Sequence, residues 1–276
     1  MKTKNLAAPY LVWMVLFTVL PLGIVVWYAF TDSITGAFTF ANLARIGTYM
    51  PIFVKSIWLA ILSALICLLV GYPVAYTIAN STPRTQRFLY MLVMLPMCMS
   101  FLLRTLAWVA LLDDTGIVNN LIRSVGLRPL PLIRNDGAVV LGMVYNYLPY
   151  MILPIYTSLT KIGQSLIEAA RDLGANGSQV FGRVILPMSV PGIISGITMV
   201  FIPSISTFII SKILGGGKDF LIGDLIEDYF LGNSGVVNYN IGAALSLVIM
   251  VMILVATFIM NHFDKDAQTS GGGSVI

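Results

Sequence analysis

The chain has few charged residues, a single histidine and two cysteines. Only 10% of its 276 residues are Asp, Glu, Lys or Arg, whereas a soluble domain carries about 25% charge, so an ordinary water-soluble fold is excluded. His262 has no second histidine with which to form a zinc site. Cys67 and Cys98 both lie in apolar runs, where we expect them to be packing residues and not a disulfide or a metal-binding pair.

Long hydrophobic runs are what the sequence has in excess. Apolar residues make up 58% of the chain, and its mean hydropathy is +0.89. A helix needs about 20 apolar residues to cross a bilayer. The sequence therefore predicts an all-α, polytopic membrane protein with six transmembrane helices, at about residues 9–30, 57–79, 88–112, 137–159, 191–214 and 241–260. We expect residues 1–262 to form one transmembrane domain and residues 263–276 to form a cytoplasmic tail, whose Gly-rich end is a flexible tail or an appended linker.

Small residues at four-residue spacing predict where these helices approach closely. Such residues are Gly71, Ala75 and Ala79 in the second span and Gly192 and Gly196 in the fifth.

Basic residues indicate the orientation. Lys2 and Lys4 precede the first span, and Arg84 and Arg87 border the tight loop after the second. Because Lys and Arg collect in short cytoplasmic loops, both termini are expected in the cytoplasm.

The loop between the fourth and fifth spans predicts a short helix. Ser165 and Glu168 fit a capping box at a helix start. Gly174 fits a left-handed helix end, and Asn176-Gly177 fits the turn after it. A helix of about two turns is marginal in isolation, so it needs a partner. We expect the chain then to pass through an amphipathic turn at 180–184 and a rigid elbow at Pro187 and Pro191.

These residues carry a family resemblance. Glu168-Ala169-Ala170, Gly174 and Val184-Ile185-Leu186-Pro187 resemble the EAA loop of ABC-importer permease subunits, although that family usually has Ile where this chain has Val184. The resemblance implies that the short helix is a coupling helix, which docks on a cytoplasmic ATPase and transmits its closure to the membrane helices. The residues expected to dock are Glu168, Ala169, Ala170, Arg171, Asp172 and Gly174.

The chain from about Ser56 to His262 also resembles B-type permease subunits of spermidine/putrescine importers. The matching motifs are Gly71-Tyr72-Pro73, Leu103-Arg104, Pro191-Gly192-Ile193-Ile194, Gly215-Gly216-Gly217-Lys218 and Leu221-Ile222-Gly223. The resemblance implies a bacterial inner-membrane protein that carries polyamines. It also implies four kinds of contact: a second homologous permease, two copies of an ABC ATPase, an external polyamine-binding protein and the lipid bilayer.

Two basic residues fall within or near the spans. An ionised group at bilayer depth is costly, so Arg104 is expected either to line the pathway or gate it, or to pair with Asp113 or Asp114. Lys212 is expected to extend to the outer surface. The candidates for the translocation pathway are Arg104, Trp108, Tyr145, Tyr147 and Lys212.

The outer loop before the sixth span is acidic. Its candidate residues are Asp219, Asp224, Glu227 and Asp228. Carboxylates hold cations by opposite charge, so this loop is expected either to attract a cation or to contact the binding protein.

The sequence offers no phosphate-binding loop. Around Gly217-Lys218, Lys212 occupies the place of the leading Gly, and Asp219 that of the Ser or Thr. We therefore expect a non-catalytic subunit without a cofactor, with ATP and Mg bound by a partner ATPase. Two alternatives stay open: an ABC permease for another solute, such as an amino acid, sulfate or iron, and a secondary transporter or channel driven by an ion gradient. The second alternative requires buried carboxylates, and residues 137–160 and 184–211 contain no Asp or Glu.

Overall fold

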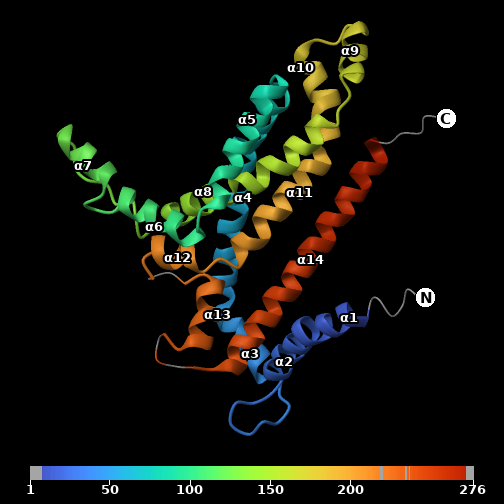
Figure 1. Ribbon diagram of the computed structural model, residues 1–276. Helices are drawn as coiled ribbons and strands as arrows, with labels where there is room; N and C mark the ends of the chain where they lie inside the picture. The colour runs from blue at the N-terminus through green and yellow to red at the C-terminus, as the bar shows by residue number, and fades with distance from the viewer. Residues whose placement is uncertain (1–7, 218–219, 234, 236, 272–276) are drawn as a thin grey trace.

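A computed structural model describes residues 8–217, 220–233, 235 and 237–271 (Figure 1). Helices make up all the regular elements of these residues, apart from one isolated β-bridge between Thr31 and Phe38. The predicted all-α, polytopic class is confirmed. The helices long and apolar enough to cross a membrane are Pro9–Ala29, Ala41–Ala79, Asp136–Thr160, Gly177–Ile205 and Tyr239–Met260. A bent pair, Pro83–Cys98 and Phe101–Ser124, makes a sixth span if it is counted as one.

The first part of the chain forms α1 (Ala8–Met14) and α2 (Leu20–Ala29), joined by a π-helical turn at Val15–Val19. A loop then leads to α3 (Ala41–Arg45) and to the long α4 (Met50–Ala79). Asn42 fixes that loop, because its side-chain amide donates to the carbonyl oxygens of Ala29 and Thr31.

The third predicted span is not one helix. Residues 88–112 divide into α5 (Pro83–Met94), a 3₁₀ turn at Leu95–Cys98, and α6 (Phe101–Leu112), with a bend of 90°. Pro96 has no N–H to continue the helix, and Met99 is extended. The prediction of a continuous helix is wrong at this point, and α7 (Ile117–Ser124) follows α6 on the same side of the bend (Figure 1).

The fifth predicted span also differs. The segment Gly177–Ile205 is helical throughout, comprising α10 (Gly177–Val180), a π-helical turn at Phe181–Ile185 and α11 (Leu186–Ile205). The expected elbow is therefore absent, and Pro191 lies inside α11. The chain breaks instead at 206–208, after Pro203, and α12 (Ile209–Leu214) begins beyond that break.

The core is formed where α4 and α11 pack against α8 (Asp136–Thr160). A Cβ atom added at Gly192 would lie 2.6 Å from the Ser158 Cβ and 2.8 Å from the Pro154 carbonyl oxygen. One added at Gly196 would lie 2.7 Å from the Met151 sulfur. The predicted close approach at these glycines is confirmed.

A second apolar cluster joins α2, α3, α13 (Ile222–Leu231) and α14 (Tyr239–Gly271). Helix α14 continues to Gly271 and so runs through most of the predicted tail. Figure 1 shows α9 (Gln164–Asp172) and α10 at one end of the bundle, and α3 and α13 at the opposite end. We call these the α9 end and the α13 end.

Candidate functional sites

The α9 end carries the loop that resembles an EAA motif. Helix α9 begins at Gln164 after Gly163, and no side chain caps it. The predicted capping box of Ser165 and Glu168 is therefore wrong, because Ser165 already lies inside the first turn. The capping box stands at the next helix start: the Asn176 side chain accepts from the Gln179 N–H at 2.9 Å, and the Gln179 side chain accepts from the Asn176 N–H at 3.0 Å.

Gly174 ends α9 as predicted. Its φ is 83°, the left-handed conformation that glycine adopts without steric cost. The Gly174 N–H donates to the Arg171 carbonyl at 2.8 Å, and the Ala175 N–H donates to the Ala170 carbonyl at 3.1 Å. These two bonds form a Schellman motif, which fixes the direction in which the chain leaves the helix.

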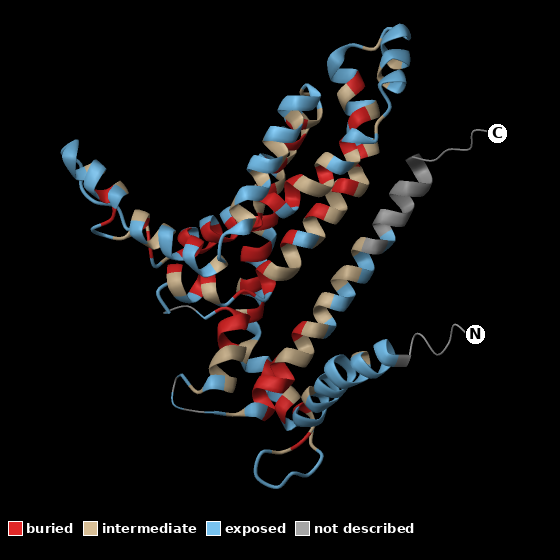
Figure 2. Ribbon diagram, in the orientation of Figure 1, coloured by how far each residue is buried: buried red, intermediate tan, exposed pale blue. Residues whose placement is uncertain are grey.

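Helix α9 has no buried residue, and Figure 2 shows it exposed along almost its whole length. Glu168, Ala169, Arg171 and Asp172 are exposed. Leu173, an apolar residue, is 90% exposed. Only Ile167 and Ala170 pack partly against the core. Helix α9 and its C-cap residue Leu173 therefore present an exposed surface whose end is fixed by the bonds at Gly174.

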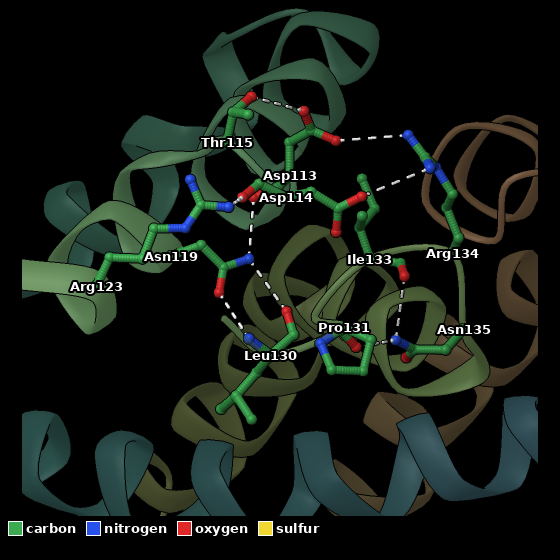
Figure 3. A network of polar contacts seen from close by, with 10 residues as sticks. All are labelled: Asp113, Asp114, Thr115, Asn119, Arg123, Leu130, Pro131, Ile133, Arg134 and Asn135. Atoms are coloured by element: carbon green, nitrogen blue, oxygen red, sulfur yellow. Dashed lines mark hydrogen bonds and ion pairs between the residues drawn. The ribbon is translucent and has the colours of Figure 1, made fainter. Parts of the chain in front are cut away.

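Arg104 is buried on α6 and lacks the predicted carboxylate partner. Its side chain is 6% exposed, and neither Nε nor Nη1 has a hydrogen-bond partner among the described residues. Its guanidinium carbon lies 5.9 Å from the centre of the Phe101 ring. Asp113 and Asp114 contact Arg134 instead, at 3.6 and 3.7 Å (Figure 3). The alternative that Arg104 pairs with these aspartates is therefore wrong.

Figure 3 shows the network that holds those aspartates. Asn119 is fully buried on α7. Its amide donates to the carbonyl oxygens of Asp113 and Leu130, both at 3.1 Å, and its oxygen accepts from the Leu130 N–H at 2.9 Å. The Arg134 N–H donates to the Leu214 carbonyl at 2.7 Å. The loop between α6 and α8 is thus tied to α12, and no sequence motif marks Asn119 for this role.

Three aromatic candidates lie along the seam between α6 and α8. The Trp108 and Tyr145 rings meet edge to face with centres 5.3 Å apart. The Tyr147 ring stacks on Phe101 at 6.4 Å, and its hydroxyl donates to the Pro203 carbonyl at 3.4 Å, next to the end of α11. The structure therefore brings Arg104 and these aromatic residues to one seam.

Lys212 belongs to a different cluster, at the α13 end. Its ammonium contacts both carboxylate oxygens of Glu227, at 2.9 and 3.0 Å. The Lys212 side chain is half exposed, as expected, and in addition it pairs with Glu227. This ion pair links α12 to α13.

Asp224 is buried beside that ion pair, with 5% exposure. Its Oδ2 accepts from the Ser211 hydroxyl and, at 2.8 Å, from the Leu221 N–H. Its Oδ1 is buried and has no hydrogen-bond partner in the described part of the chain. Burial raises the pKa of Asp224 from 3.8 to about 6, although the Ser211 hydrogen bond opposes the shift. Asp219, the remaining acidic candidate apart from Asp228, lies outside the described residues.

Two further serines, Ser56 and Ser211, hold the α13 end together. The Ser56 hydroxyl accepts from the Ile222 N–H at 2.9 Å. No local pattern distinguishes these serines, because their partners are far away in the sequence.

Comparisons with known proteins agree with the fold. Residues 68–269 match the family described as binding-protein-dependent transport system inner membrane component. The spermidine/putrescine transport system permease protein PotB of Haemophilus influenzae is 33% identical over 92% of this chain and 91% of its own length. PotB of Escherichia coli is 32% identical, over 87% of this chain and 90% of its own length.

Among solved structures, a chain of a bacterial ABC transporter that imports alginate has a TM-score of 0.75 at 20% identity, covering 95% of this chain and 94% of its own. A chain of the MetNI methionine ABC transporter has a TM-score of 0.58 at 17% identity, covering 80% of this chain and 98% of its own.

Proposed function

The chain belongs to the family of binding-protein-dependent transport system inner membrane components, and on this premise we propose that it is a permease subunit through which a bacterial ATP-binding-cassette importer moves polyamines. Two relatives support this substrate. They are similar to this chain over about nine-tenths of its length, and both are named for spermidine and putrescine transport. The alginate and methionine transporters share the fold at low identity, so the fold alone does not select the substrate.

The exposed helix α9 is the observation that carries the mechanism. It joins α8 to the helical segment that continues into α11, and both of those helices belong to the core. A force applied to α9 is therefore transmitted to two helices that pack closely against each other at Gly192 and Gly196. Glu168, Ala169, Ala170, Arg171, Asp172 and Gly174 form the surface on which the ATPase docks.

The proposed assembly contains this chain, a second similar permease, two copies of a cytoplasmic ABC ATPase and an external polyamine-binding protein. ATP and Mg bind to the ATPase, so this chain is a non-catalytic subunit that holds no cofactor. The α9 end then faces the cytoplasm, together with both termini, and the α13 end faces the binding protein. Residues 1–262 act as one transmembrane unit.

Alternating access follows from this arrangement. ATP binding closes the ATPase dimer, α9 moves with it, and the bundle opens towards the binding protein. Trp108, Tyr145 and Tyr147, with Arg104 beside them, line the proposed route, where aromatic faces attract an ammonium group. Two alternatives rank below this one. An ABC permease for another solute would use the same loop, whereas a secondary transporter has no need of a docking helix.

Reconstitution of the whole assembly in proteoliposomes tests the proposal. We expect uptake of radiolabelled spermidine that requires ATP, the ATPase and the binding protein, and that unlabelled putrescine reduces while amino acids and sulfate do not. If one of those other solutes reduces spermidine uptake, that solute replaces polyamine as the proposed substrate. Uptake that an ion gradient drives without the ATPase would contradict the class of transporter.

A further inference from the structure

A cavity of about 220 Å³ opens beside α12 and α13, at the α13 end. Its lining includes three carboxylates, a lysine, an aromatic ring and an amide; these groups belong to Lys212, Phe220, Asp224, Glu227, Asp228 and Asn233. Among these lining residues, three carboxylates outnumber the one ammonium of Lys212, and such an excess of negative charge concentrates cations. An acidic cluster alone does not define a ligand, so the hydrogen bonding inside the cavity decides the assignment.

The buried carboxylate of Asp224 supplies that evidence. Its Oδ2 already accepts two hydrogen bonds, from Ser211 and Leu221, and these bonds fix the orientation of the carboxylate. Its Oδ1 is buried with no hydrogen-bond partner within the described residues. Leaving a buried charged acceptor unsatisfied is expensive. A donor that is absent from the described chain, and preferably a cation, would complete this site.

Lys212 identifies the chemistry of that donor. Its ammonium lies against Glu227 at the wall of the same cavity, bound to both carboxylate oxygens. The chain thus places one primary alkylammonium group in a cavity that has a further acceptor to offer. A free alkylammonium ion has the same charge, donors and hydrocarbon stem as a lysine side chain.

We propose that this cavity binds one terminal ammonium group of the polyamine, and that Lys212 occupies the site as a tethered substitute until the polyamine displaces it. The incoming ammonium group donates to Asp224 Oδ1 and to Glu227, while the Phe220 ring and the Asn233 amide contact the methylene chain and the ammonium. Lys212 then moves out towards solvent, to which its half-exposed side chain already has access. The proposal rests on the proposed function for the identity of the ligand.

A purely structural ion pair makes the opposite prediction for one variant. If Lys212 only ties α12 to α13, its removal lowers stability and leaves polyamine affinity unchanged or weaker. If Lys212 competes with the polyamine, Lys212→Gln removes the competitor and leaves Glu227 available, so affinity rises. The charge-retaining variant Lys212→Arg should stay close to wild type.

The experiment measures binding of radiolabelled spermidine to the intact permease–ATPase complex, in nanodiscs of uncharged lipid and without the binding protein. We expect Lys212→Gln to lower the Kd about fivefold, and Asp224→Asn and Glu227→Gln to raise it about tenfold, as expected for loss of one charge-assisted hydrogen bond. Lys55→Gln is the matched control, because it breaks a lysine–carboxylate pair of 2.9 Å, to Asp136, outside this cavity. It should leave the Kd unchanged. Thermal unfolding of each variant shows that it is folded.

Two failures are distinguishable. If wild-type assemblies take up spermidine but Lys212→Gln binds it no more tightly and Asp224→Asn binds it equally well, the cavity is not the ammonium site and the proposed function stands. If the wild-type assembly takes up no polyamine at all, the proposed function fails, and the ligand assigned to the cavity fails with it.

Discussion

The two ends of the bundle are stabilised in different ways. At the α9 end, capping and turn bonds join neighbours in the sequence, such as Asn176 with Gln179, and α9 buries no residue. At the α13 end, the first residues of α13 are buried, and hydrogen bonds join distant segments, such as Ser56 with Ile222. Figure 2 shows the same contrast in exposure. The α13 end is held by contacts between distant segments of the chain, whereas the α9 end has a fixed local shape and an exposed surface.

The largest effect is expected from Gly174→Asp, at the α9 end. An Asp at a φ of 83° costs about 1–2 kcal/mol, and the change redirects the chain after α9 while the core stays intact. We expect uptake by the reconstituted assembly to fall at least about tenfold while ATP hydrolysis continues, a barrier difference of about 1.4 kcal/mol or more. Gly182→Ala is the control, because a Cβ there meets nothing within 4 Å. If uptake by Gly174→Asp stays coupled to ATP hydrolysis, α9 does not transmit the movement of the ATPase to the membrane helices.

A matched pair of serines compares the stabilities of the two ends. Ser211→Ala removes a donor from the buried Asp224 carboxylate, and loss of such a bond costs about 1–3 kcal/mol. Ser165→Ala should cost far less, since Ser165 does not cap α9. Thermal unfolding of the two purified variants measures the difference. Equal losses would mean that the α13 end is no more tightly built than the α9 end.

Asp224→Asn tests whether the buried, ionised carboxylate of Asp224 lowers the stability of the folded chain. Because burial raises the pKa of Asp224 from 3.8 to about 6, the folded state binds this proton more tightly than the unfolded state. The Asp224 contribution to stability is therefore largest below pH 3.8 and is lost as the pH rises through about 6. Lys212 and Glu227 also face this carboxyl group, and Asp228 lines the same cavity.

At neutral pH, Asp224→Asn should therefore unfold at a temperature a few degrees above wild type, and it should lack the decline of stability through that pH range. Unfolding midpoints of both proteins across the range give the answer. A variant less stable than wild type at neutral pH would show that the charged carboxylate contributes favourably to folding.

The smallest effect is expected from Asn176→Ala, which removes the cap of α10. Loss of such a cap costs about 1 kcal/mol, and α10 remains attached to α11 through the π-helical turn. We expect a slight fall in the unfolding midpoint and a modest loss of uptake. Asn176→Asp, which retains a capping oxygen, should restore both; a failure to restore them would assign another role to Asn176.

Hydropathy was sufficient to predict the all-α membrane fold, because a long apolar run is the main requirement for a helix that crosses a bilayer. Gly174 could be predicted since its conformation is local. The 90° bend after α5 could not be predicted from hydropathy, because both arms are apolar. The start of α9 was misplaced because Ser165 with Glu168 fits the capping pattern, and only the backbone shows that the helix already begins at Gln164.

The charged contacts were harder to predict than the helices. Asp113 and Asp114 form ion pairs with Arg134 and not with Arg104. Lys212 pairs with Glu227 on the next helix. Each choice depends on which helices are neighbours in space, and spacing in the sequence does not contain that information.

The central claim is that the α9 end, and not the α13 end, docks on the ATPase. Crosslinking from the two ends tests this claim most directly. In a chain where Cys67 and Cys98 are replaced by Ser, a cysteine is placed at Leu173, directly after α9, or at Leu231 on α13, both exposed. A reducible crosslinker applied to the assembled importer should join residue 173 to the ATPase and stop uptake until it is reduced. Residue 231 should not reach the ATPase. A crosslink to the ATPase from residue 231, or full uptake while residue 173 is crosslinked, would contradict the account.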